Sequence, residues 1–343
     1  MPNSRRRFVS SLLTLPLASL SGRSLAQLEA PRPIRINIPG PGAMPFMPIE
    51  LVHKLGIDRA LGVELLIRYF PSGVQAIEDM QAGNADFAGL GFVVLPRMQS
   101  KGQDVVAIAP LSGSTPPFSV VVRAPLSGKV RTLADLKGRS VGVPIGSAKS
   151  KTYLQSMAEL MLISGGVQAD QVRWVGTGQN IEGLIGALAG EVVDAVFCEE
   201  PFSSALARRR IGFVLADLRN ATLASHVPGA GHLRAVIATR RTLVAQDPQR
   251  AALMVQTLKR ALAWMHRQKP ETIIGRMDVV DDQDRRDQIA ALENSPRIFP
   301  TDTRFSRAQV EATRVFLRAG GDTSAESFDP ERVIVDTWAG SRP

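Results

Sequence analysis

Apolar residues change their spacing along the chain in a way that predicts helices alternating with strands. From Ile181 they recur at i, i+3, i+4 and i+7, which is typical of a short amphipathic helix. Residues 192–197 are almost continuously apolar, as in a strand that is buried on both faces. Gly190 stands between the two, and we expect it to end the helix in the left-handed conformation that glycine adopts at little cost.

An earlier stretch repeats this order. A strand candidate at 65–70 is followed by the turn Ser72-Gly73, a short helix that ends at Gly83, and the apolar pair after Asp86. Asp86 then corresponds to Asp194 in the later copy. Two copies predict two α/β lobes on one plan, with a ligand cleft at the carboxyl ends of their strands. We interpret both aspartates as turn caps, and a pair of functional acids is the alternative.

The order of elements predicts where each lobe begins and ends. We expect the first lobe to contain residues 27–118 and 240–343, and the second to contain residues 119–239. Strands at 118–123 and 233–239 are predicted to cross between them. Mixed sheets flanked by helices are expected in both lobes.

Three charged stretches have simple structural interpretations. Asp247 followed by Pro248 is typical of the start of a helix. Arg208–Arg210 are expected at a solvated helix end, where cations suit the helix dipole. Residues 281–288 are rich in charge and are predicted to form a solvated face.

The amino terminus is predicted to be an export signal that covers residues 1–26. Ser4-Arg5-Arg6-Arg7-Phe8 resembles the twin-arginine motif, and residues 8–22 carry no charge. Small residues up to Ala26 are typical of a cleavage site, so we expect the mature chain to begin at Gln27 in the periplasm. No cysteine lies near this site, so no lipid anchor is expected.

Composition argues against several classes of function. The net charge of +9 falls to +5 when the four arginines of residues 1–26 are removed, and the remaining charge is scattered, which disfavours nucleic-acid binding. The four histidines do not stand at metal-ligand spacing, and Cys198 is the one cysteine. No nucleophile or nucleotide motif is present. We therefore expect no metal, no cofactor and no catalysis.

Small polar turns between strands and helices are the candidate binding elements. Ser72-Gly73, Ser147-Ala148-Lys149 and Thr177-Gly178 each follow a predicted strand and open a predicted helix. Free amides at a helix start bind anions, although serine and threonine are also ordinary helix caps. Three such turns at equivalent strand ends favour a shared anion site.

These stretches together resemble a known family. LADLKGRSVGV at 133–143, FPSG at 70–73, AGNAD at 82–86, and GEVVDA at 190–195 with Glu200-Pro201 are similar to motifs of bacterial ABC-importer binding proteins. The group is the NMT1/THI5-like one, which binds nitrate, sulfonates, taurine and thiamine precursors. The likeness covers residues 34–264.

The resemblance implies a two-lobed periplasmic binding protein fold of type II. It implies a monomer that holds a small anionic ligand in its cleft and delivers the ligand to an inner-membrane ABC permease, without chemistry. Carried over by position, the ligand-binding residues are Met44, Phe46, Ser72, Gly73, Gly91, Phe92, Ser114, Thr115, Ser147, Ala148, Lys149, Thr177, Gly178, Gln179 and Glu200.

The charges expected around the cleft indicate the chemical class of the ligand. Helix starts favour a sulfonate or carboxylate, while an acid at Glu199 or Glu200 suits an amine or hydroxyl at the other end, as in an aminosulfonate. Which acid faces the cleft stays open, and Glu200 could instead bond backbone amides inside the fold. Two alternatives are an enzyme related to thiamine-pyrimidine synthases and a sensor for a thiamine-precursor-like ligand.

Overall fold

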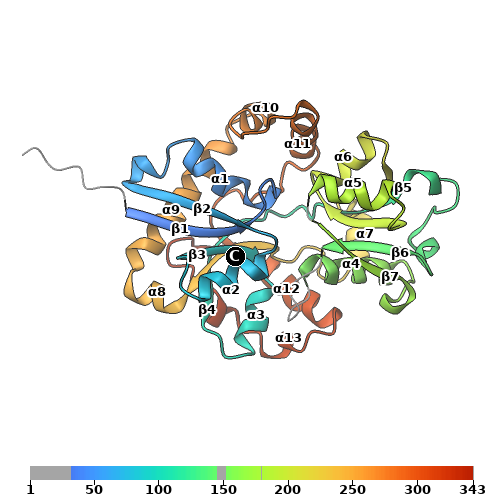
Figure 1. Ribbon diagram of the computed structural model, residues 1–343. Helices are drawn as coiled ribbons and strands as arrows, with labels where there is room; N and C mark the ends of the chain where they lie inside the picture. Colours follow the sequence, from blue (N-terminus) through green and yellow to red (C-terminus); the bar gives the residue numbers. More distant parts are fainter. Residues whose placement is uncertain (1–31, 145–151, 179, 343) are drawn as a thin grey trace, which may run out of the picture. The chain divides into compact units, whose positions relative to one another are not determined.

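A computed structural model describes residues 32–144, 152–178 and 180–342 of the 343-residue chain, and its strands form two five-stranded sheets (Figure 1). The predicted signal peptide, 1–26, lies outside the described residues. So do the predicted site residues Ser147, Ala148, Lys149 and Gln179.

The first sheet has the strand order β2-β1-β3-β10-β4, in which β10 runs antiparallel to both neighbours and β1 is parallel to β2 and β3. The bounds are β1 Arg32–Pro39, β2 Val63–Phe70, β3 Phe87–Gly91, β4 Val105–Pro110 and β10 Ala235–Arg240. Helices α1 (Met47–Lys54) and α2 (Gly73–Gln81) lie on opposite faces of this sheet (Figure 1). Further helices beside it are α3 (Val94–Gln99), α8 (Arg241–Gln246) and α9 (Pro248–Met265).

The second sheet repeats the plan with the order β7-β6-β8-β5-β9. Its strands are β5 Phe118–Arg123, β6 Ser140–Pro144, β7 Arg173–Thr177, β8 Ala195–Glu199 and β9 Gly212–Asp217. Helices α4 (Tyr153–Ser164) and α5 (Ile181–Ala189) cover its two faces (Figure 1). Helices α6 (Phe202–Arg208) and α7 (Ala221–His226) follow β8 and β9.

The carboxyl-terminal part is mainly helical, as predicted. It contains α10 (Pro270–Ile274), α11 (Asp282–Asn294), α12 (Arg307–Ala319), α13 (Ser324–Ser327), α14 (Pro330–Val333) and the short parallel pair β11 (Phe305–Ser306) and β12 (Ser341–Arg342). The predicted cap of α9 is confirmed, because the Asp247 side chain accepts a hydrogen bond from the Arg250 amide at 3.0 Å. No described helix is long and apolar enough to cross a membrane.

The repeat predicted from the sequence is confirmed in detail. Asp86 accepts a hydrogen bond from the amide of Arg35 in β1 at 2.8 Å, and Asp194 accepts one from the amide of Ser140 in β6 at 3.1 Å. Each aspartate therefore stands just before a strand, β3 or β8, and its carboxylate bonds to the backbone of the neighbouring strand of the same sheet, β1 or β6.

Gly190 ends α5 as its C-cap, as predicted, but it is not in the left-handed conformation that we expected. Gly190 has φ −79°, and the left-handed residue of the second copy is Glu191, at φ 57°, where the first copy has Gly83, at φ 92°. Gly83 and Glu191 each precede their aspartate by three positions, so the left-handed residue and the aspartate have the same spacing in both copies.

The strands at 118–123 and 235–240 do not run between the sheets. The first pairs wholly within the second sheet, and β10 pairs wholly within the first, although we had assigned residues up to 239 to the second lobe. The connections are instead the segments 111–117 and 227–234. The exact lobe boundaries, 27–118 with 240–343 and 119–239, stay a prediction.

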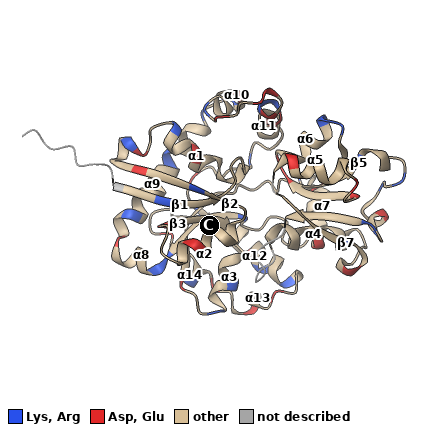
Figure 2. Cartoon of the chain, viewed as in Figure 1, with Lys and Arg blue, Asp and Glu red and all other residues tan. Residues whose placement is uncertain are grey.

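Two stretches that we expected to be solvated contact each other. Arg209 of α6 pairs with Asp284 and Asp287 of α11, and Arg208 pairs with Asp287 at 3.1 Å. The Asp287 side chain is only 3 % exposed. These ion pairs join the second lobe to α11. Elsewhere acidic and basic residues alternate along the chain (Figure 2).

Candidate functional site

A small pocket lies where the strand ends and helix starts of the two lobes meet. Its volume is about 30 Å³, close to the share of one water molecule in the liquid. The lining residues are Pro39, Ala43, Phe46, Ser72, Gly73, Val74, Gly91, Val94 and Ala235 beside the first sheet, and Thr152, Tyr153 and Glu199 beside the second. We call it the interlobe pocket.

Two helices, α2 and α4, begin at the interlobe pocket. The hydroxyl of Ser72 caps α2 by accepting from the Gln75 amide at 3.3 Å, and that of Thr152 caps α4 by accepting from the Gln155 amide at 3.1 Å. Thr152 also donates to the carbonyl of Pro144 at 2.9 Å. The first-turn amides of both helices have no intrahelical acceptor, so the pocket has positive partial charge on two sides.

The lobes touch at the interlobe pocket through Tyr153 and Gly91. A Cβ atom added to Gly91 would lie 2.6 Å from the Tyr153 ring, so a side chain here would clash. Gly91 therefore permits the close approach of α4 to β3. A ligand larger than water requires the Tyr153 ring or the lobes to move apart.

Glu199, the last residue of β8, places a carboxyl group in the interlobe pocket. Burial raises the pKa of Glu199 to about 7, although Arg234 and the hydroxyl of Tyr153 favour the charged form. Tyr153 donates to this carboxylate at 3.5 Å. Glu199 therefore changes its charge near neutral pH and can accept hydrogen bonds from a ligand amine or hydroxyl.

Arg234 lies behind this carboxyl group, just before β10. Its side chain is buried, and burial lowers the pKa of Arg234 to about 10. The guanidinium carbon stands 5.9 Å from the centre of the Phe118 ring. Neither terminal nitrogen has a hydrogen-bond partner among the described residues. An unpartnered buried guanidinium favours a negative charge nearby.

His232, two residues earlier, is a packing residue. Burial lowers the pKa of His232 to about 3, and its ring stacks on Phe316 with centroids 4.3 Å apart. The ring is therefore neutral. Among the described residues no three His, Cys, Asp or Glu side chains gather as a metal site.

Of the predicted site residues that the structure describes, four lie together in the interlobe pocket: Phe46, Ser72, Gly73 and Gly91. Met44 is close in sequence but lines a separate cavity. Phe92 is fully buried and packs edge-on against Phe328 at 6.0 Å. Ser114 and Thr115 lie on the 111–117 connection, and the Thr115 amide bonds to the carbonyl of Arg297.

Thr177 and Gly178 do not form a helix cap. Asn180 caps α5 instead, accepting from the Gly183 amide at 2.7 Å. The Thr177 hydroxyl is buried and lacks a partner among the described residues. Neither Thr177 nor Gly178 lines the interlobe pocket. The cap of α4 is Thr152, further along the chain than the expected Ser147.

Glu200 faces the interior of the second lobe, so the acid at the pocket is Glu199. The Glu200 carboxylate accepts from the Ser204 hydroxyl at 2.7 Å and pairs with Arg219 at 2.7 Å. It is fully buried. This corresponds to the alternative in which Glu200 bonds within the fold.

Sequence reasoning missed Thr152, Tyr153 and Arg234 at or behind the pocket. Arg234 did leave a signal, because it is a charged residue within the otherwise apolar stretch 233–238. The signal for Thr152 and Tyr153 is weaker. Thr152 is a favoured cap residue just before a predicted helix, and Tyr153, at the start of that helix, is one of two tyrosines in the chain.

Solved structures share this architecture. A protein of Bordetella bronchiseptica RB50 is 21% identical with a TM-score of 0.77, covering 91% of this chain and 96% of its own. The alkanesulfonate-binding protein SsuA of Xanthomonas axonopodis pv. citri, bound to MOPS, is 18% identical with a TM-score of 0.69, covering 91% and 99%. The periplasmic nitrate-binding protein NrtA of Synechocystis PCC 6803 is 11% identical with a TM-score of 0.65, covering 90% and 87%. At these identities the likeness shows the fold, and the predicted two-lobed periplasmic binding protein fold is confirmed.

Comparison with curated proteins gave no match. Among protein families, the one described as NMT1/THI5 like matches residues 59–273, which is more than half of the chain and includes most of the interlobe pocket. The chain therefore belongs to the NMT1/THI5-like family, as its sequence motifs predicted.

Proposed function

We propose that this protein is the solute-binding component of an ABC importer and that it captures a small organic anion between its lobes. The observation that carries the proposal is the meeting of two helix starts, α2 and α4, one beside each sheet, at the interlobe pocket. Similarity to alkanesulfonate-binding and nitrate-binding proteins supports it.

The anionic end of the ligand would lie between Ser72 and Thr152. Each hydroxyl accepts a hydrogen bond from an amide of its own helix. The Ser72 hydroxyl can donate its proton to a ligand oxygen, and the Thr152 hydroxyl can do so by giving up its bond to the Pro144 carbonyl. First-turn amides add partial positive charge, and the guanidinium of Arg234 adds a full one nearby. A sulfonate or carboxylate suits these donors.

The other end of the ligand would face Glu199. A second negative group would be repelled by this carboxylate, whereas an ammonium or hydroxyl would donate to it. An aminosulfonate or amino acid-like compound therefore matches both ends. Apolar contacts from Phe46 and Val74 suit a short carbon skeleton between them.

Isothermal titration calorimetry of the purified protein with taurine, ethanesulfonate, benzoate, nitrate and glucose tests this function. We expect one-to-one binding of at least one organic anion, with taurine preferred to ethanesulfonate. Glu199→Gln should remove that preference and keep ethanesulfonate binding. Binding of nitrate alone, or of glucose alone, would contradict the proposal.

The cellular role follows from the same proposal. A protein of this kind works in the periplasm and passes its ligand to an inner-membrane permease, acting as a monomer without chemistry on the ligand. Export through the twin-arginine route, from residues 1–26, is part of the proposal. Co-purification of the ligand-loaded protein with an inner-membrane ABC permease would test the partner.

A further inference from the structure

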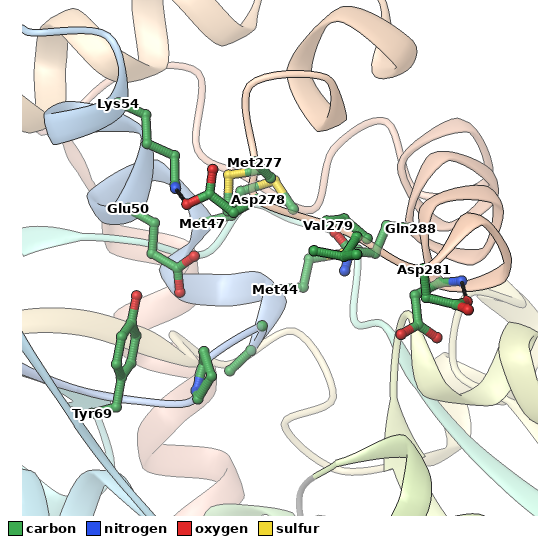
Figure 3. A pocket seen from close by; sticks show the side chains of 15 residues that line it. Met44, Met47, Glu50, Lys54, Tyr69, Met277, Asp278, Val279, Asp281 and Gln288 are labelled. Carbon is green, nitrogen blue, oxygen red and sulfur yellow. Dashed lines mark hydrogen bonds and ion pairs between the residues drawn. The ribbon is translucent and has the colours of Figure 1, made fainter.

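A second cavity, of about 500 Å³, lies beside α1 and the segment that leads into α11 (Figure 3). It shares only Ala43 with the interlobe pocket. Its volume is within the range of small-molecule sites, about 300–1,000 Å³. We call it the α1 cavity.

A buried carboxylate, Glu50, faces the α1 cavity from α1. The residue is 6 % exposed, and its Oε1 atom has no hydrogen-bond partner among the described residues. Burial raises the pKa of Glu50, and the Gly42 amide, Lys54 and Tyr69 offset this only in part. A buried carboxylate oxygen without a partner is costly, and a bound donor would relieve that cost.

Acids outnumber bases around the α1 cavity. Glu50, Asp278, Asp281 and Asp284 line it, and Lys54 is the one base among the lining residues that the structure describes. Lys54 is paired with Asp278, and Asp284 with Arg209. The lining therefore carries a net negative charge, which favours a cation.

Three methionines give the lining a large part of its apolar surface. Met44, Met47 and Met277 project toward the same space as Glu50 and Tyr69 (Figure 3). Methionine sulfur makes favourable contacts with aromatic rings, and its flexible chain fits irregular shapes. Val280, at the rim, is 92 % exposed, so the cavity is open to solvent on that side.

We propose that the α1 cavity is a second binding site, separate from the interlobe pocket, for an organic ammonium compound with an aromatic or aliphatic body. The ammonium group donates to the free oxygen of Glu50, and the three methionines surround the body. A neutral or anionic compound of the same shape leaves that oxygen without a partner and meets the acidic rim.

Methionine methyl NMR with benzylammonium as the probe tests the second site. The methyl signals of Met44, Met47 and Met277 should shift saturably as benzylammonium is added, while those of Met157 and Met161, in the core of the second lobe, should not. Benzyl alcohol and benzoate should give no saturable shift at the same concentration. Saturable shifts confined to Met157 or Met161, or none at millimolar benzylammonium, would overturn the proposal.

Two variants give independent checks. Glu50→Gln should weaken benzylammonium binding by about tenfold or more, because it removes a charge-assisted hydrogen bond. Glu64→Gln, on the exposed side of β2, is the matched control and should bind like the parent. Met277→Trp adds a bulky ring to the wall of the cavity and should weaken benzylammonium binding, which gives a check even if Glu50→Gln fails to fold. Unchanged affinity in a folded Glu50→Gln protein, or in Met277→Trp, would refute the site.

Discussion

Glu199 is a carboxyl group held away from water at the interlobe pocket, and its titration affects stability. Its pKa is about 7 in the folded protein and 4.5 when unperturbed. At a pH between these two pKa values, Glu199 has lost its proton in the unfolded chain and retains it in the folded protein. The free energy of unfolding should therefore fall by roughly 3 kcal/mol as pH rises from about 4.5 to about 7.

Urea unfolding at several pH values checks this contribution. Glu199→Gln has no proton to lose, so its stability should be flatter across that window than the parent's. Glu64→Gln, an exposed acid exchanged in the same way, should keep the parent's slope. If Glu199→Gln and the parent show the same slope, burial does not raise the pKa of Glu199 as described.

Glu199 and Glu200 are adjacent acids, and the sequence alone does not decide which of them faces the pocket. Successive residues at a strand end point to opposite faces, so one of two adjacent acids faces the pocket and the other faces the interior. Which one does so depends on the register of β8 against β5 and β6, a long-range pairing that local sequence does not contain. Arg219, the partner that holds Glu200 inside, is distant in sequence as well.

At the scale of elements, α6 and α11 are joined by ion pairs that hold the lobes in this arrangement. Replacing Arg209 by Gln removes the pairs with Asp284 and Asp287, and it leaves the buried Asp287 with Arg208 as its remaining ion-pair partner among the described residues. Because a closed form retains its ligand, we expect weaker ligand affinity, by about tenfold, although Arg209 does not line the interlobe pocket.

Titration calorimetry with the preferred anion measures this effect. Arg210→Gln, the neighbouring residue, which is exposed and has φ 57°, is the matched control and should bind like the parent. High salt should also weaken ligand binding by the parent protein, though by less than Arg209→Gln does, because salt screens partly exposed ion pairs. Equal affinities of Arg209→Gln and Arg210→Gln would show that the α6–α11 contact plays no part in closure.

Local elements were predictable, and their partners were not. Apolar spacing predicted the strands at 118–123 and 233–239 and the helices around them, since each pattern is carried by adjacent residues. Both strands insert antiparallel into a sheet, and the choice of sheet depends on pairing across the chain. The contact between Arg208–Arg210 and residues 281–288 also depends on pairing across the chain. Both stretches have the high charge that is typical of solvated faces, and this charge does not reveal that they contact each other.

At the scale of the whole molecule, the internal repeat was visible in the sequence because both copies keep the turn and its aspartate. From this repeat a two-lobed protein with a cleft could be predicted. In the structure Asp86 and Asp194 bond to equivalent strands, β1 and β6. Part of the lining of the interlobe pocket could be predicted, because Ser72, Gly73 and Gly91 stand at or just after strand ends and Phe46 lies just before α1. Tyr153 lines the pocket, and Arg234 lies behind it, only through the packing of one lobe on the other.

Export is a second property of the whole chain. Arg5 and Arg6, followed by an uncharged run, should direct the protein through the twin-arginine route. Lysine at both positions keeps the charge and should leave the precursor in the cytoplasm, as cell fractionation with immunoblotting would show. Lysine at Arg23, near the predicted cleavage site, is the control. Undiminished periplasmic recovery of the Arg5→Lys, Arg6→Lys protein would exclude this route.

The central claim is that one ligand joins the helix starts of both lobes. Calorimetric titration of Ser72→Ala, Thr152→Ala and the double variant with the preferred organic anion tests it most directly. Each substitution removes a helix cap and should lower stability by about 1 kcal/mol, as should Ser306→Ala, which uncaps α12 away from the pocket. We predict that either pocket variant weakens anion binding, the double variant by about tenfold or more, and Ser306→Ala leaves it unchanged. Parent-like affinity in the folded double variant would contradict the account.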